Sequence, residues 1–225
     1  MSGFIAIEGG DGSGKRTQAE IFYRYAVDEL KKNVLKMSFP RYSEPSAFYA
    51  KQYLNGIYGS AEDVHPELGI LPFALDRYAA SPEIRQHLAL PNSLVISDRF
   101  MASNLAHQGA KIADAGERKS FYEKTMHTEY EILNIPRPMK NIVLLVPTHI
   151  AQANIDRKDP ATRTYTEQQR DIHEADASHL EMAKANYEEL CRLYPDEFVS
   201  INCVDASGNM RSVDSIQDEI RQLLG

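Results

Sequence analysis

The chain has 225 residues, of which 43% are hydrophobic and 25% charged, as in an ordinary globular protein. Its 25 Lys and Arg residues against 32 Asp and Glu residues give a formal net charge of −7 at pH 7, which argues against non-specific nucleic-acid binding. The two cysteines make neither a CxxC pair nor a disulfide framework. No apolar stretch reaches the roughly 18 residues of a membrane span, and no secretory signal is recognised. We therefore expect a cytoplasmic protein that binds neither nucleic acid nor membrane.

Short apolar runs alternate along the chain with longer amphipathic segments. The runs rich in β-branched or aromatic residues, which predict buried parallel strands, are 4–7, 34–39, 94–96, 142–146 and 198–204. The segments with helical patterning are 17–32, 48–54, 66–90, 115–135, 150–157, 172–193 and 213–224. This alternation predicts an α/β fold of three layers, with a five-stranded parallel sheet flanked by helices. Because no repeat or long linker interrupts it, residues 1–225 are expected to form a single domain.

A glycine-rich segment, Gly-Gly-Asp-Gly-Ser-Gly-Lys-Arg-Thr at 9–17, lies between the first strand and the first helix. Glycines let the backbone adopt positive φ and turn its N–H groups toward a phosphate, while the helix N-terminus adds partial positive charge. Lys15 then reaches the β- and γ-phosphates as a mobile point charge. Strand, loop and helix in this order match the P-loop motif and predict a P-loop NTPase fold. The residues expected to hold the nucleotide phosphates are Gly10, Asp11, Gly12, Ser13, Gly14, Lys15, Arg16 and Thr17.

The loop departs from the motif at one position. A Ser or Thr that binds Mg²⁺ is expected directly after the lysine, whereas this chain has Arg16 and only then Thr17. Mg²⁺ gives up its water reluctantly, so phosphates and water can supply most of its ligands. Asp98 ends the third apolar run, at the edge where α/β proteins bind ligands, and is expected to orient the water shell of Mg²⁺. Arg99 is expected to hold a phosphate bidentately. The alternative for this Asp-Arg pair is a surface ion pair.

Distinctive segments follow the glycine-rich loop in order. They are Phe-Pro-Arg-Tyr at 39–42, Phe-Ala-Leu-Asp-Arg at 73–77, Asp-Arg-Phe-Met-Ala-Ser-Asn-Leu-Ala-His-Gln-Gly at 98–109, Glu-Tyr-Glu-Ile-Leu-Asn-Ile-Pro-Arg-Pro at 129–138 and Asp-Ala-Ser at 205–207. With residues 4–18 they resemble the thymidylate kinase family of nucleoside monophosphate kinases over nearly the whole chain. The resemblance implies a homodimeric, Mg²⁺-dependent enzyme that transfers the γ-phosphoryl group of ATP to dTMP, giving dTDP and ADP. No Asn-Lys-x-Asp segment, the usual guanine-reading motif of GTPases, is present.

The resemblance also implies which residues bind the acceptor nucleotide. They are Asp11, Arg41, Phe73, Arg77, Arg99, Asn104, Gln108 and Tyr165. Phe73 and Arg77 are four residues apart and share one helix face, so one can stack on a pyrimidine ring while the other donates to its carbonyl oxygen. Asn104 and Gln108, again four apart, resemble the polar edge that reads the base. A plain core position is the alternative for Phe73.

The resemblance also assigns specific roles to three of these residues and adds Asp205. Asp11 is implied to accept a hydrogen bond from the 3′-hydroxyl of the sugar. Arg41, with Arg99, is implied to clamp the phosphate of the acceptor. Asp205 lies in a loop that resembles the segment lining the adenine ring of ATP.

The segment 156–176 is dense in charge and carries little apolar patterning. On its own it indicates a solvated loop entering a helix, whereas the resemblance implies a mobile lid that closes over the phosphates. Because 11–13 holds no basic residue before Lys15, the lid is expected to supply the transition-state arginine, and Tyr165 to pack on the acceptor. The expected catalytic residues are Lys15, Arg99, Arg157 and Arg163.

The implied reaction needs alignment and charge compensation more than acid–base help. The acceptor is already an anionic phosphate, so no general base is required. Two alternatives stay open: a kinase for another pyrimidine monophosphate, and a non-catalytic nucleotide-binding regulator, which Arg16 favours. One methyl group in an apolar pocket is worth only about 1–3 kcal/mol, so the sequence does not rank dTMP above dUMP.

Overall fold

The computed structural model describes residues 2–156 and 177–223, which contain a five-stranded parallel sheet in the order β2-β3-β1-β4-β5. The strands are β1 (Gly3–Gly9), β2 (Asn33–Ser38), β3 (Ser93–Asp98), β4 (Lys140–Leu145) and β5 (Phe198–Asn202). All five match the apolar runs in the sequence, so the predicted sheet is confirmed. The central strand β1 is buried along its whole length, as a parallel strand covered on both faces must be.

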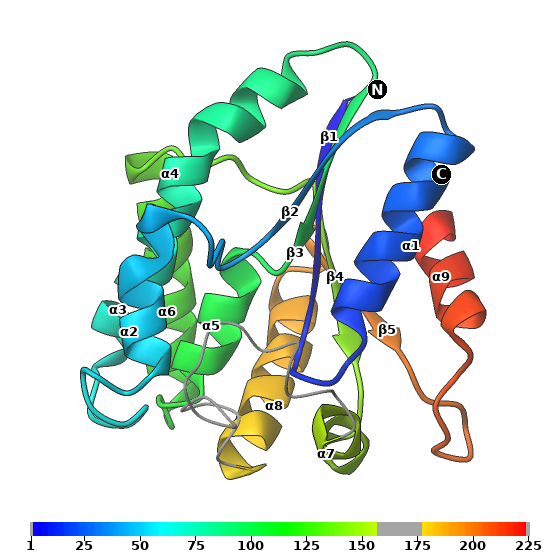
Figure 1. Cartoon of the computed structure of the whole chain (residues 1–225). Coiled ribbons are helices and arrows are strands. Elements are labelled where there is room, and N and C mark those ends of the chain that lie inside the picture. The colour runs from blue at the N-terminus through cyan, green and yellow to red at the C-terminus, as the bar shows by residue number, and fades with distance from the viewer. Residues whose placement is uncertain (1, 157–176, 224–225) are drawn as a thin grey trace.

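Helices cover both faces of this sheet (Figure 1). They are α1 (Lys15–Asp28), α2 (Phe48–Leu54), α3 (Pro66–Gly69), α4 (Leu71–Leu88), α5 (Met101–Gly109), α6 (Ala115–Met126), α7 (Thr148–Asp156), α8 (Ala177–Leu193) and α9 (Val213–Gln222). A short 3-10 turn, η1 (Pro45–Ala47), precedes α2, and a π-turn, η2 (His127–Ile132), follows α6. None of the helices in the described ranges is long and apolar enough to cross a membrane.

The alternation of side chains along β1 divides the core into two clusters. Phe4 and Ala6 pack on one face with residues of α4, α5, α6 and α8. Ile5 and Ile7 pack on the other face with residues of α1, α7 and α9. Successive side chains of a strand point to opposite faces, so a single apolar run supplies both clusters. The result is the predicted arrangement of three layers.

Three helical predictions need correction. The helix expected over 66–90 is broken at Ile70 into α3 and α4, because Pro72 lies in the first turn of α4, a position where its missing N–H costs nothing. The helix expected over 115–135 ends as α6 and continues as the π-turn η2. Helix α5 was not predicted at all. It is only nine residues long, and its polar residues Asn104, His107 and Gln108 face the pocket rather than solvent.

The strand order brings two loops together at one edge of the sheet. Strands β1 and β3 are neighbours, and Ile7 of β1 pairs with Asp98 of β3. Because both strands run in the same direction, the glycine-rich loop after β1 and the turn after β3 leave the sheet side by side. This is the carboxyl edge, where open α/β sheets bind ligands.

Candidate active site

The glycine-rich loop has the backbone of a phosphate cradle. Gly12 and Gly14 adopt φ values of +78° and +88°, and Gly14 is the N-cap of α1. The Lys15 side chain is buried and its Nζ donates to the carbonyl oxygen of Gly10 at 2.6 Å, so the ammonium folds over the loop. An N-terminus of a long helix under such a loop attracts anions. The side chains of Arg16 and Thr17 are exposed at the start of α1.

Helix α7 packs directly against this loop. A Cβ atom on Gly12 would overlap the backbone of Ala151, at 2.8 Å from its carbonyl carbon. The Asn154 Nδ2 donates to the carbonyl oxygen of Gly12 at 2.9 Å. Glycine is therefore required at position 12 both for its conformation and for this close approach. Arg157, Arg163 and Tyr165 belong to the segment 157–176 that follows α7, which lies outside the described residues.

The turn after β3 holds Arg99 in an unusual backbone conformation, with φ +65°. Its guanidinium donates to the Gly9 carbonyl oxygen at 3.2 Å and to Ser103 Oγ at 3.0 Å, and it forms an ion pair with Asp11. Burial has the largest single effect and disfavours the charge of Arg99, but Asp11, Tyr187, Asp98 and Glu8 together outweigh it and hold the pKa of Arg99 above its usual value. The expected phosphate-binding arginine is thus tied to the glycine-rich loop.

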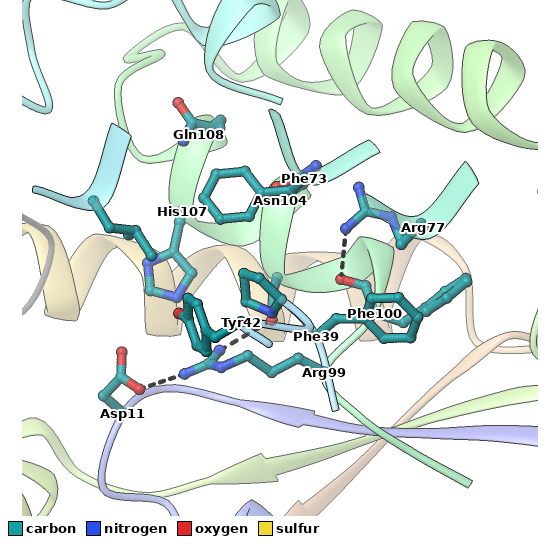
Figure 2. A pocket seen from close by; sticks show the side chains of 13 residues that line it. Asp11, Phe39, Tyr42, Phe73, Arg77, Arg99, Phe100, Asn104, His107 and Gln108 are labelled. Carbon is teal, nitrogen blue, oxygen red and sulfur yellow. Dashed lines mark hydrogen bonds and ion pairs between the residues drawn. The ribbon is translucent and has the colours of Figure 1, made fainter. Parts of the chain in front are cut away.

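A pocket opens directly beside this Asp11–Arg99 pair (Figure 2). It contains about 630 Å³ of empty space, which includes space open to solvent. The residues that line it are Asp11, Phe39, Pro40, Tyr42, Leu54, Phe73, Arg77, Arg99, Phe100, Ser103, Asn104, His107 and Gln108. Six residues that the sequence suggested for acceptor binding are therefore brought together: Asp11, Phe73, Arg77, Arg99, Asn104 and Gln108. Figure 2 places Asp11 and Arg99 at one end of the pocket and Gln108 at the other.

Helices α4 and α5 supply the polar end of the pocket. The Asn104 Nδ2 donates to the carbonyl oxygen of Ile70 at 3.2 Å. The Gln108 Nε2 donates to the buried hydroxyl of Tyr53 at 3.0 Å, and the Tyr53 ring packs edge-on against Phe73 with 5.7 Å between centroids. Both amides are therefore fixed by their neighbours: Asn104 through its Nδ2, and Gln108 at both ends, because its Oε1 also accepts from the Tyr53 hydroxyl at 3.4 Å.

Arg77 is held beneath the pocket by an acid that sequence analysis missed. Its Nε and Nη2 donate to Glu129 at 2.7 and 2.6 Å, and its Nη1 donates to the carbonyl oxygen of Phe100 at 3.4 Å. Both charged side chains are almost completely buried, with exposures of 2% and 0%. No local sequence pattern could reveal this ion pair, because Glu129 lies 52 residues further along the chain, in the π-turn η2.

Two other predicted residues contact protein groups outside the pocket. The Arg41 Nε pairs with Asp76 at 3.1 Å and its Nη2 donates to Ser46 Oγ at 3.0 Å, so only its neighbours in the chain line the pocket. Its role as a phosphate clamp stays a prediction. Asp205 accepts hydrogen bonds from the backbone N–H groups of Ser207 and Asn209 at 2.8 and 3.0 Å. This stabilises the loop that was expected to line the adenine ring, and contact of Asp205 with ATP also stays a prediction.

His107 is buried in the pocket wall, where its Nδ1 lies 3.4 Å from the Nε2 of His179 on α8. Burial and the nearby charge of Arg99 lower the pKa of His107 to about 3. The imidazole is therefore neutral near pH 7. Its low basicity agrees with a reaction that needs no general base.

The donor set agrees with a magnesium site that relies on phosphates and water. Within residues 2–156 and 177–223, no group of three or more His, Cys, Asp or Glu side chains gathers to hold a metal ion. Mg²⁺ needs only one or two carboxylates when phosphates and water complete its shell. Asp98 at the end of β3 and Asp11 in the loop flank Arg99 closely enough to raise its pKa, so carboxylates are available at this edge.

Comparisons with known proteins agree with this geometry. Residues 7–202 match the model of the family described as thymidylate kinase. A thymidylate kinase of Mycobacterium tuberculosis is 32% identical over 192 residues, covering 83% of this chain and 84% of that protein. A probable thymidylate kinase of Pyrobaculum aerophilum is 30% identical over 165 residues, covering 71% of this chain and 73% of the relative.

Solved structures give the same fold. The thymidylate kinase of Candida albicans superposes with a TM-score of 0.66 at 19% identity, over 99% of this chain and 91% of that one. The enzyme of Ehrlichia chaffeensis gives a TM-score of 0.63 at 17% identity, over 100% and 99% of the two chains. Sequence, fold and site thus point to one family. The chain belongs to the thymidylate kinase family.

Proposed function

We propose that this chain transfers the γ-phosphoryl group of ATP to dTMP, giving dTDP and ADP. One observation carries the proposal: Asp11 and Arg99 join the glycine-rich loop to the pocket, so that donor and acceptor phosphates would meet at one point. The thymidylate kinase relatives give the nature of the acceptor. Arg16 is the one sequence feature that points to a regulator without activity, and none of the relatives favours that alternative or a kinase for a different nucleotide.

The acceptor nucleotide would lie along the pocket from Arg99 to Gln108. Arg99 binds its phosphate, Asp11 accepts from the 3′-hydroxyl of its sugar, and Phe73 stacks on its base. Because the Asn104 Nδ2 is engaged by the Ile70 carbonyl, the Oδ1 is the atom available to the base. An acceptor at that position suits the N3–H of thymine or uracil, whereas cytosine presents an acceptor there.

The donor phosphates would lie over the glycine-rich loop, with Lys15 on the β- and γ-phosphates. Mg²⁺, when bound, neutralises charge on the β- and γ-oxygens, and Asp98 would hold it through water. Arg99 and Lys15 then keep the two phosphates in line without a base. A lid over 156–176 that supplies Arg157 or Arg163, with Tyr165 on the acceptor, remains part of the proposal.

We also propose that the enzyme is a cytoplasmic homodimer. Leu68, Leu71, Leu75 and Tyr78, from α3 and α4, are all exposed, with exposures from 44% to 60%. The three on α4 recur at helical spacing and form an apolar row of the kind that pairs with a second copy. Sedimentation equilibrium of wild type and of the Leu75→Glu variant tests this. A dimer that the charge converts to monomer supports the proposal, and a monomeric wild type contradicts it.

Release of ADP in a coupled assay tests the activity. ATP and Mg²⁺ are supplied with dTMP, dUMP, UMP, dCMP or no acceptor. The proposal expects turnover to be greatest with dTMP and close to zero without acceptor. Equal turnover with dCMP would contradict the assignment of Asn104, and ATP consumption that ignores the acceptor would contradict the proposal as a whole.

A further inference from the structure

Glu8, the penultimate residue of β1, has a completely buried side chain that lies outside the acceptor pocket. Its Oε1 accepts from the backbone N–H of Phe100 at 2.6 Å. Its Oε2 accepts from Ser103 Oγ at 2.8 Å and from the Tyr187 hydroxyl at 3.4 Å. Burying a carboxylate is costly unless hydrogen bonds compensate. An apolar side chain facing α5 would be buried at a lower free-energy cost. The presence of an acid at this position therefore indicates a functional role.

The first contact of Glu8 fixes the backbone around Arg99. A φ of +65° is uncommon for any residue with a Cβ atom, and it persists only where the surroundings enforce it. Hydrogen bonds on both sides enforce it here, and the Arg99 carbonyl oxygen also accepts from Ser97 Oγ. The N–H of Arg99 donates to the Ile7 carbonyl oxygen at 2.9 Å, and the next N–H, that of Phe100, donates to Glu8. Glu8 therefore supplies one of the three hydrogen bonds that hold this turn.

The second contact fixes the side chain of Arg99. The hydroxyl of Ser103 donates its only proton to Glu8 and accepts from the Nη1 of Arg99 at 3.0 Å. The carboxylate thereby sets which way the hydroxyl points and leaves its lone pairs toward the guanidinium. Glu8 is thus connected to Arg99 by two independent routes, through Phe100 N–H and through Ser103 Oγ. The positive charges of Arg99 and Lys15 in turn favour its ionised form, although burial raises the pKa of Glu8 overall.

We propose that Glu8 is a positioning residue for the acceptor phosphate: through Phe100 and Ser103 it holds Arg99 in the orientation that binds the phosphate of the nucleotide. This rests on the proposed function, in which Arg99 contacts that phosphate. Glu8 itself contacts neither nucleotide. The proposal distinguishes positioning from simple structural support, because a residue that acts through Arg99 has no further effect once Arg99 is gone.

A double-mutant cycle tests this distinction, with Glu8→Gln, Arg99→Ala and the combined variant. Glutamine keeps the volume but replaces one acceptor oxygen by a donor, so Phe100 N–H or Ser103 Oγ loses its partner. The dissociation constant of dTMP, measured by calorimetry without ATP, is expected to rise by about tenfold to hundredfold in Glu8→Gln, the effect of a lost hydrogen bond to a charged group. In the Arg99→Ala background the same substitution is expected to change it by less than about threefold. The dissociation constant of ATP is expected to stay within about threefold throughout, since the glycine-rich loop is intact.

Two further variants complete the experiment. Glu20→Gln makes the same substitution at an exposed position of α1, and is expected to leave dTMP binding unchanged. Ser103→Ala interrupts only the route through the side chain, and serves if Glu8→Gln does not fold. It is expected to weaken dTMP binding by about tenfold in wild type and not in Arg99→Ala.

The proposal is overturned if Glu8→Gln, or Ser103→Ala in its place, weakens dTMP binding equally with and without Arg99, or leaves it unchanged. Turnover of wild type with dTMP is measured separately in the coupled assay. A wild type that turns over dTMP while the cycle shows no coupling overturns the role of Glu8 alone. A wild type that does not phosphorylate dTMP overturns the proposed function, whatever the cycle shows.

Discussion

Arg77 and Glu129 form a bidentate ion pair under the acceptor pocket, with Nε–Oε2 and Nη2–Oε1 distances of 2.7 and 2.6 Å. The pair joins α4 to the π-turn η2 and leaves Nη1 as the guanidinium nitrogen that Glu129 does not hold. It fixes the plane of Arg77 before any nucleotide arrives. Preorganisation of this kind spares the bound state the entropy of ordering a long side chain.

Removing either Arg77 or Glu129 alone should destabilise the fold far more than replacing both residues together. Glu129→Ala leaves an arginine charge buried without its partner, so the free energy of unfolding is expected to fall by about 3–5 kcal/mol. Urea unfolding followed by circular dichroism measures this. Glu131→Ala, at an exposed neighbouring position, is the control and should change stability by less than about 0.5 kcal/mol.

The combined variant Arg77→Met with Glu129→Leu separates stability from binding. Apolar side chains of similar size replace a buried ion pair at little cost, so it should regain most of the lost stability. It should still bind dTMP more weakly than wild type, because the base loses its donor. Glu129→Ala as stable as Glu131→Ala would show that the pair contributes nothing to the fold.

Lys15→Met tests the charge over the glycine-rich loop. The ammonium is buried beside the Gly10 carbonyl, where a phosphate would replace that hydrogen bond. Loss of a preorganised charge at the transferring group is expected to lower kcat by about 10² to 10³. Steady-state kinetics measure it, with the exposed Lys119→Met on α6 as the control. If both variants turned over at the wild-type rate, the loop would not serve the reaction.

Gly69 lies against the amide of Gln108, which is proposed to read the base. A Cβ atom there would overlap the Gln108 Oε1 and come within 2.7 Å of its Cδ. Gly69→Ala should therefore displace the amide and raise the KM for dTMP, while the KM for ATP stays unchanged, since overpacking disturbs only its surroundings. Gly116→Ala on α6, which does not line the pocket, should leave both constants unchanged. An unchanged KM for dTMP in Gly69→Ala would exclude Gln108 from acceptor binding.

Lys111 gives the stability a pH dependence of known sign. Burial lowers its pKa from the ordinary 10.5 to about 8, while its Nζ donates to the Tyr53 hydroxyl at 3.1 Å and the Val64 carbonyl oxygen at 2.9 Å. Between pH 8 and 10.5 the unfolded chain binds more protons at this site, so its contribution to stability rises with pH. Urea unfolding at pH 7.5, 9 and 10 should show that the free energy of unfolding of wild type increases with pH relative to that of Lys111→Met. A constant difference between the two would contradict the lowered pKa.

Local patterns predicted the parts of this molecule that are locally encoded. Each strand is a continuous apolar run, and the glycine-rich loop carries its function in adjacent residues, so both could be recognised in the sequence. Helix α5 was missed because it spans only nine residues, too few for a clear helical pattern. The break at Ile70 in the helix expected over 66–90 was also missed, because the apolar pattern continues through this position.

The supporting contacts of the site could not be predicted in the same way. Glu129 holds Arg77 from 52 residues away, and Glu8 holds Phe100 from 92 residues away. No periodicity links such pairs, because only the sheet order and the helix packing bring them together. Arg41 shows the converse. Its position in a recognisable segment predicted contact with the acceptor phosphate, whereas in the structure its side chain pairs with Asp76.

The central claim is a transfer of phosphate between two nucleotides, and following the phosphate tests it most directly. ATP labelled with ³²P at the γ-position is incubated with Mg²⁺, dTMP and enzyme, and the products are separated by chromatography. The account predicts label in the β-phosphate of dTDP with wild type, and almost none with Lys15→Met. Label that appears only as inorganic phosphate, or that stays in ATP while dTMP is present, would contradict it.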